Sequence, residues 1–171
     1  MRELTRLRAA CEARLADVAV PHPFDLDTFC RSIAGHRGRP MHLHTVTVPA
    51  GPGQPFALWL GADDADHVFV DAAATGWHRD HLVCHEIGHM LFDHMLVDRT
   101  AESGGTADAT RLLMPDLDPA MVRRVLARHA YDTRQEREAE LTATLILERA
   151  RRRPAGPFDA LDAAFGRGAG W

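Results

Sequence analysis

The stretch 81–94 constrains this chain most, because it is predicted to form one amphipathic helix that carries an HExxH motif. His85 and His89 are four residues apart, so on a helix they share one face and both imidazoles can bind one ion. Glu86 lies one residue further round, where it can reach a water on that ion without displacing either histidine. The motif is typical of zinc hydrolases in which the glutamate is the general base.

The residues around the motif support a buried helix. Apolar side chains recur at helical spacing and give the helix a stripe that can pack against a core. The alternative is a histidine-rich surface helix with an accidental match to the motif. The apolar positions are Leu82, Val83, Ile87, Met90, Leu91 and Met95.

Length and composition predict a single domain over residues 1–171. A chain of 171 residues is long enough for one core and short for two. Hydrophobic residues make up 46% and charged residues 26%, which is ordinary for a globular protein. The net charge of −4 gives no electrostatic footprint for nucleic acid, so we expect no direct nucleic-acid binding.

Cysteine usage and hydropathy indicate a cytoplasmic protein. Cys11, Cys30 and Cys84 cannot all pair and show no CxxC spacing, which disfavours a disulfide framework. The N-terminus lacks the apolar core of a signal peptide, and no stretch approaches 18 apolar residues. We therefore expect a reducing compartment and no membrane association.

The pattern ahead of the motif predicts helices followed by strands. A helix over 3–17 is expected first, then a second that Asp25 or Asp27 caps and that ends near Gly35 or Gly38. The β-branched and alternating runs that follow predict a small, antiparallel sheet of about three strands. The fold class is therefore α+β, with the HExxH helix packed on that sheet. The three strands are expected at 41–48, 56–60 and 67–71.

Two more helices are predicted after the motif. Residues 99–108 are polar and predict an exposed loop. Asp118-Pro119 is expected to open a helix that carries Met121, Val122, Val125, Leu126 and His129. Thr133 and Glu136 match a capping box, which predicts a final helix through Ala150. Residues 166–171 are expected to form a frayed tail.

Two histidines do not complete a catalytic zinc site, because such sites have three protein ligands and a water. Glu136 has a role in the capping box. Glu138 lies one and two turns before Leu141 and Leu145, so it borders the apolar stripe and can project inward. It can equally pair with Arg134 at the surface. The candidates for the third ligand are Asp93, His94, Asp98, His129, Glu136, Glu138 and Glu140.

The chain resembles the ImmA/IrrE metallopeptidases over roughly residues 25–150. The likeness lies in His85-Glu-x-Gly-His89, in His94, and in a later helix reading Glu136-Arg-Glu138-Ala-Glu-Leu-Thr-Ala. It implies a minimal zincin-like fold in which His85, His89 and Glu138 bind zinc and Glu86 is the base. It also implies a regulatory protease that cleaves a protein partner, typically a helix-turn-helix repressor encoded nearby.

Other roles remain as hypotheses. Tyr131 and His129 are candidate donors to the oxyanion, and Asp93 or Asp71 is expected to hold the second N–H of a histidine ligand. Gly88 is expected where another helix or a substrate strand comes close. The rival functions are a non-catalytic, zinc-containing binding module and the toxin of a toxin–antitoxin pair. Glu86 favours catalysis, because a structural zinc site does not need it.

Overall fold

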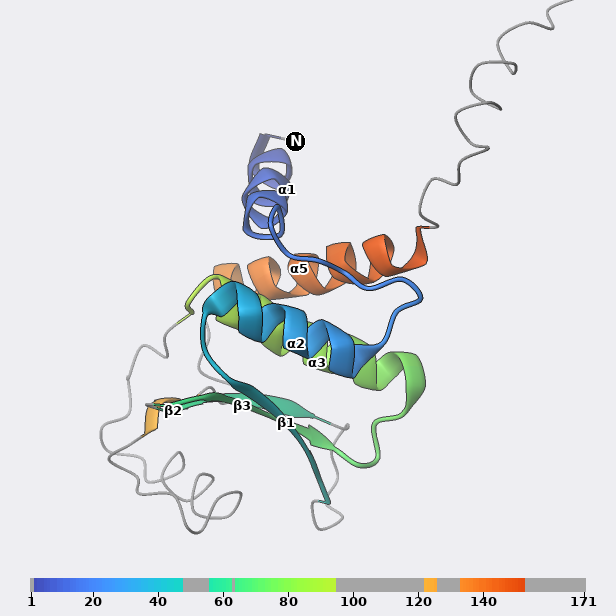
Figure 1. Ribbon diagram of the computed structural model, residues 1–171. Helices are drawn as coiled ribbons and strands as arrows, with labels where there is room; N and C mark the ends of the chain where they lie inside the picture. Colours follow the sequence, from blue (N-terminus) through green and yellow to red (C-terminus); the bar gives the residue numbers. More distant parts are fainter. Residues whose placement is uncertain (1, 48–55, 63, 95–121, 126–132, 153–171) are drawn as a thin grey trace, which may run out of the picture.

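The computed structural model describes residues 2–47, 56–62, 64–94, 122–125 and 133–152 (Figure 1). Helices lie on one side of a small sheet, which confirms the predicted α+β class. Among the described residues, no helix is both long and apolar enough to cross a membrane. The elements in chain order are α1 (Arg2–Arg14), α2 (Leu26–Arg37), β1 (Met41–Val46), β2 (Ala57–Ala62), β3 (Asp66–Asp71), α3 (Gly76–Leu91), β4 (Val122–Val125) and α5 (Thr133–Arg151).

The sheet is mixed and its strand order is β1-β3-β2-β4. β2 runs antiparallel to both β3 and β4, but β1 is parallel to β3, so the prediction of an antiparallel sheet is wrong for β1. The turn between β2 and β3 is tight, with the Ala62 N–H donating to the Ala65 carbonyl at 2.9 Å. Because β2 pairs with one edge of β3 in this hairpin, β1 pairs with the other edge. All but the last residue of β3 are buried, as is typical of a central strand with a parallel neighbour.

Strand β4 lies where a helix is predicted. Val122–Val125 pairs with the outer edge of β2, with Val125 opposite Leu60. The prediction of a helix through Val122 and Val125 is therefore wrong. Valine suits a strand, and pairing with a sheet edge outweighs helical spacing in so short a segment. The rest of that predicted helix, the loop 99–108 and the tail 166–171 lie outside the described residues.

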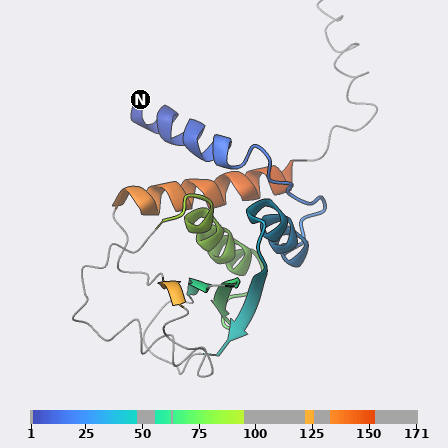
Figure 2. The same cartoon turned by 60° about the vertical axis from the view of Figure 1, so that its left-hand side comes forward.

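The helices form layers above the sheet. α2 and α3 cover one face of the sheet, α5 packs on α3 on the side away from the sheet, and α1 packs on α5 (Figures 1 and 2). One cluster of buried apolar side chains runs from α1 to α5. Its largest fully buried members are Trp59, Phe29 and Phe69.

The ends of α2 follow the predicted capping residues. The Asp25 carboxylate accepts the Thr28 N–H at 2.8 Å, so one orphan donor of the first turn is satisfied. Gly38 ends the helix with φ of 66°, a left-handed conformation that glycine adopts without steric cost. Of the predicted alternatives, Asp25 and Gly38 are the residues that cap this helix.

A buried polar cluster ties α2 to the sheet and to the end of α3. Asp66 at the start of β3 is only 1% exposed, and its carboxylate accepts from Arg37 Nε at 2.9 Å and from Trp59 Nε1 at 3.0 Å. Arg37 also donates to the Met90 carbonyl. Burying this carboxylate is therefore compensated by a charged partner and a hydrogen bond.

Three strand histidines gather on neighbouring strands. His42 opposes His67 in register, and His44 lies two residues further along β1. His44 Nε2 is 3.0 Å from His67 Nδ1, and the His67 ring is stacked with the rings of His42 and His44. Histidines that alternate along strands usually face solvent. His42 does so, but His44 is half-buried and His67 is buried.

Candidate metal centre

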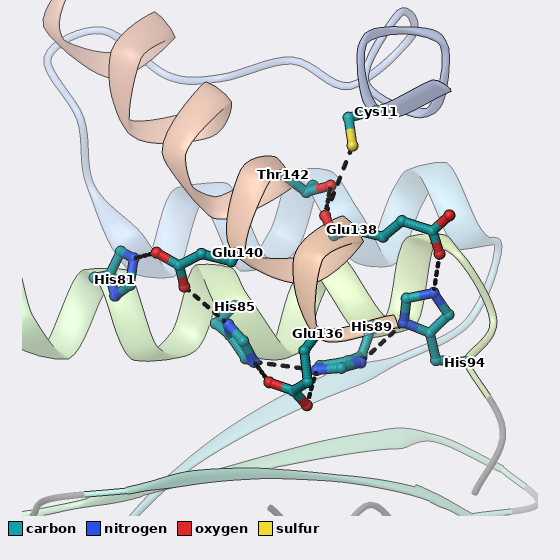
Figure 3. A network of polar contacts seen from close by, with 9 residues as sticks. All are labelled: Cys11, His81, His85, His89, His94, Glu136, Glu138, Glu140 and Thr142. Atoms are coloured by element: carbon teal, nitrogen blue, oxygen red, sulfur yellow. Dashed lines mark hydrogen bonds and ion pairs between the residues drawn. The ribbon is translucent and has the colours of Figure 1, made fainter. Parts of the chain in front are cut away.

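Helix α3 supplies the two histidines of the motif. His85 and His89 lie one turn apart on the face that meets α5, and their Nε2 atoms are 3.1 Å apart (Figure 3). His85 is half-buried and His89 is completely buried. The structure thus places the two Nε2 atoms side by side, as the four-residue spacing predicts.

The third potential ligand comes from the first turn of α5. Glu136 Oε2 lies 3.6 Å from His85 Nε2, and Glu136 Oε1 lies 3.6 Å from His89 Nε2. One ligand atom from each of the three residues fits within a group whose members are all within 4.8 Å of one another. These three side chains can therefore hold one metal ion, with Glu136 in the place predicted for Glu138.

Glu138 points to another side of α5. Its Oε2 is 3.0 Å from His94 Nε2, and its Oε1 accepts from Arg134 Nε at 2.9 Å. Two residues along an α-helix correspond to a turn of about 200°, so Glu136 and Glu138 cannot point the same way. Glu138 does project inward as predicted, since it is 6% exposed, but it contacts His94 rather than the two motif histidines.

Gly88 explains how α5 comes so close to α3. A Cβ atom at Gly88 would lie 2.8 Å from both the Cα and the carbonyl oxygen of Ala139, closer than real contacts allow. The backbones of the two helices therefore meet at this pair. The sequence predicts that a helix or a substrate strand comes close to Gly88, and the structure shows that it is helix α5. The crossing places Glu136, one turn before Ala139, beside the histidines.

Each motif histidine is held through its Nδ1 atom. His85 Nδ1 lies 3.3 Å from Glu140 Oε2, and Glu140 Oε1 lies 3.1 Å from His81 Nε2. His89 Nδ1 lies 2.9 Å from His94 Nδ1. Both Nε2 atoms are thus directed at Glu136, as Figure 3 shows. Partners of this kind set the orientation and tautomer of a histidine ligand.

The aspartates expected in this supporting role make other contacts. Asp71 accepts the N–H of Ala73 at 2.9 Å, and Asp93 lies 3.7 Å from Arg37 Nη1. The sequence does contain a pattern that indicates the carboxylates of α5 as partners of the α3 histidines. Histidines recur every four residues in α3, and carboxylates recur every four residues in α5, which suits two antiparallel helices in contact. These stripes are His81, His85 and His89, and Glu136 and Glu140.

The predicted base, Glu86, lies between α3 and β2. Its side chain is buried, and Oε2 accepts the backbone N–H of Trp59 at 3.1 Å. One oxygen of this carboxylate is thus held by the backbone of the sheet. Tyr131, His129 and Asp98 lie outside the described residues, so their roles stay predictions.

The electrostatic environment keeps His89 neutral. Burial, together with the neighbouring His85 and His94, lowers the pKa of this imidazole to about 2. A neutral imidazole is the form that binds a metal ion. The donor set of two imidazoles and one carboxylate is one that catalytic zinc sites use, so the residues present fit zinc.

A comparison of the chain with protein-family models, curated proteins and solved structures finds no match to any of them. The resemblance to the ImmA/IrrE metallopeptidases therefore rests on the motif residues themselves and stays a prediction.

Proposed function

We propose that this chain is a zinc-dependent metallopeptidase whose ion is held by His85, His89 and Glu136. The observation that supports it most is the convergence of these three side chains, with ligand atoms within 4.8 Å of one another. A purely structural zinc site is usually closed by four protein ligands, whereas three leave a position for water or substrate. Among the residues that the structure describes, three potential ligands converge, and this donor set favours the enzyme over the binding module.

Bound by His85, His89 and Glu136, zinc would supply Lewis acidity and would make water acidic enough to lose a proton near neutral pH. Glu86 acts as the general base, which takes the proton of the attacking water and passes it to the leaving amine. The hydrogen bond from Trp59 holds one carboxylate oxygen of Glu86, so the group is oriented before substrate arrives. His81 and Glu140 orient His85.

The resemblance suggests the substrate class. We propose that the substrate is a protein, and that a helix-turn-helix repressor encoded nearby is the first candidate. The toxin half of a toxin–antitoxin pair remains the rival role, in which cleavage acts on a target other than the neighbouring repressor. A cytoplasmic location follows from the same proposal.

The test uses Glu86→Gln, because glutamine keeps the shape of the side chain but cannot take a proton. Purified products of the adjacent genes are incubated with wild-type or variant protein, with and without a chelator, and fragments are followed by mass spectrometry. We expect Glu86→Gln to keep zinc and fold while cleavage falls by about 10²-fold or more. If both proteins bind a partner and neither yields a fragment, the chain is a binding module.

A further inference from the structure

Three buried side chains, in contact one after another, lead from the candidate metal centre into the interior. His89 Nδ1 lies 2.9 Å from His94 Nδ1, and His94 Nε2 lies 3.0 Å from Glu138 Oε2 (Figure 3). His89 is 0%, His94 5% and Glu138 6% exposed, so bulk water does not compete for these contacts. Neither His94 nor Glu138 is one of the three side chains that face the proposed ion.

The end of α3 places His94 against His89. Asp93 adopts φ of 53°, a left-handed conformation, directly after the C-cap Phe92. The N–H of His94 then bonds to the carbonyl of His89 at 3.0 Å, and that of Asp93 to Met90 at 3.1 Å. This pair of bonds is the Schellman motif, which ends a helix and brings the residue after the turn back beside the last full turn. The helix stop therefore sets the contact between the two rings.

Glu138, the last of these three side chains, is held in place by contacts within α5 and with α1. Arg134 donates to Glu138 Oε1 at 2.9 Å, which gives the buried carboxylate a cationic partner and leaves Oε2 for His94. The backbone carbonyl of Glu138 accepts from Thr142 Oγ1 at 2.7 Å and contacts Cys11 Sγ of α1. Glu138 is thus held on both its backbone and its side chain.

We infer that His94 and Glu138 form a relay that fixes the tautomer and ring orientation of His89, so that His89 binds zinc through Nε2. The inference rests on the proposed metal centre. It makes His94 and Glu138 positioning residues, which act on the ion through His89.

Zinc binding through His89 Nε2 would leave one arrangement of protons along these contacts. A neutral His89 that gives its Nε2 lone pair to zinc carries its proton on Nδ1, which donates to His94 Nδ1. His94 Nδ1 must then be unprotonated, so the His94 proton is on Nε2 and is donated to Glu138 Oε2. Carboxylates that support histidine ligands in this way raise ligand basicity, and here a second histidine extends the link.

Zinc affinity of the full chain, measured by competition with a zinc-binding dye, tests the relay. We expect His94→Leu and Glu138→Gln to weaken zinc binding by about 10- to 100-fold, as for other outer partners of metal ligands. His94→Gln should recover part of the loss, because its amide oxygen can accept the His89 proton. Glu148→Gln, an exposed carboxylate on the same helix, is the control and should bind as wild type. Circular dichroism verifies that each variant is folded.

A spectroscopic readout separates positioning from mere packing. Nitrogen-15 NMR of the zinc-loaded wild type should show His89 protonated at Nδ1 and His94 protonated at Nε2, and the His94 signals should shift in Glu138→Gln. Wild-type affinity in folded His94→Leu and Glu138→Gln, or a proton on His94 Nδ1, would overturn the relay. If the wild type binds no more zinc than His85→Ala, the metal centre itself fails and the relay fails with it.

Discussion

Outside the metal centre, we expect substitution of Asp66 to lower the stability of the protein most. It is almost fully buried and bonds both Arg37 of α2 and Trp59 of β2. Removing one member of a buried ion pair leaves the other charge uncompensated, so Asp66→Ala should lower the free energy of unfolding by about 3–5 kcal/mol. Chemical denaturation measures the change.

The matched control at the residue scale is an exposed ion pair. Glu12 accepts from Arg8 at 2.8 Å one turn away on α1, and both side chains are exposed. Glu12→Ala should cost less than about 1 kcal/mol, because water screens such pairs. Equal losses for Asp66→Ala and Glu12→Ala would show that the buried cluster does not hold α2 to the sheet.

The sequence predicts some residues of the candidate metal site and not others. The spacing of His85, Glu86 and His89 is enough to place two imidazoles on one helical face. The choice between Glu136 and Glu138 needs the position of α5 around α3, which no local pattern encodes. The resemblance implies that Glu138 binds the ion, and the apolar stripe that it borders allows its side chain to point inward. Glu138 is indeed buried, but it contacts His94.

At the scale of elements, Gly88 sets the distance between α3 and α5. Adding a methyl group there brings it within 2.8 Å of the Ala139 backbone, so one of the helices must move. Gly88→Ala should destabilise the protein by about 1–3 kcal/mol, as overpacking does, and should weaken zinc binding because Glu136 shifts with α5. Thermal denaturation and zinc titration measure the two effects.

Gly35 in α2 is the control for that substitution. A Cβ atom there meets nothing within 4 Å, so Gly35→Ala gains helix propensity without a clash. We expect unfolding free energy to rise by up to about 1 kcal/mol and zinc binding to stay as in the wild type. If the two alanine variants behave alike, close contact at Gly88 is not what positions α5.

The elements themselves were predictable to different degrees. Helices α2, α3 and α5 have capping residues or strong apolar periodicity. α2 and α5 appear where the sequence places them, whereas α3 covers Gly76–Leu91 and so begins and ends earlier than the predicted helix over 81–94. Two features depend on contacts between distant segments and so leave no local signal, namely the parallel pairing of β1 with β3 and the addition of β4 to the edge of β2. A four-residue segment such as Val-Arg-Arg-Val of β4 is too short for its spacing to separate a turn of helix from a strand.

At the scale of the whole molecule, stability should depend on pH through the buried His67 and the half-buried His44. Burial lowers the pKa of His67, with His44 and His42 nearby adding to the effect, and burial followed by His42 lowers that of His44. As pH falls through about 6.5, these side chains take up protons in the unfolded chain while the folded protein resists them. The free energy of unfolding should therefore decrease as pH is lowered from about 7.5 to 5.5.

Denaturation in the presence of a chelator measures this dependence without a contribution from bound metal. His67→Gln combined with His44→Gln removes both groups, so the loss of stability over the same pH range should be smaller than in the wild type. The slope against pH is the readout, so a uniform change in stability does not affect it. Identical slopes for the two proteins would mean that these histidines do not govern the acid response.

The most direct measurement for the metal centre is a crystal structure of the zinc-loaded protein with anomalous data at the zinc edge. We expect one strong peak between α3 and α5, about 2.0–2.2 Å from Nε2 of His85, Nε2 of His89 and a carboxylate oxygen of Glu136. Glu138 should remain on His94. A peak bonded to Glu138 instead of Glu136, or no peak beside the two histidines, would contradict the proposed centre.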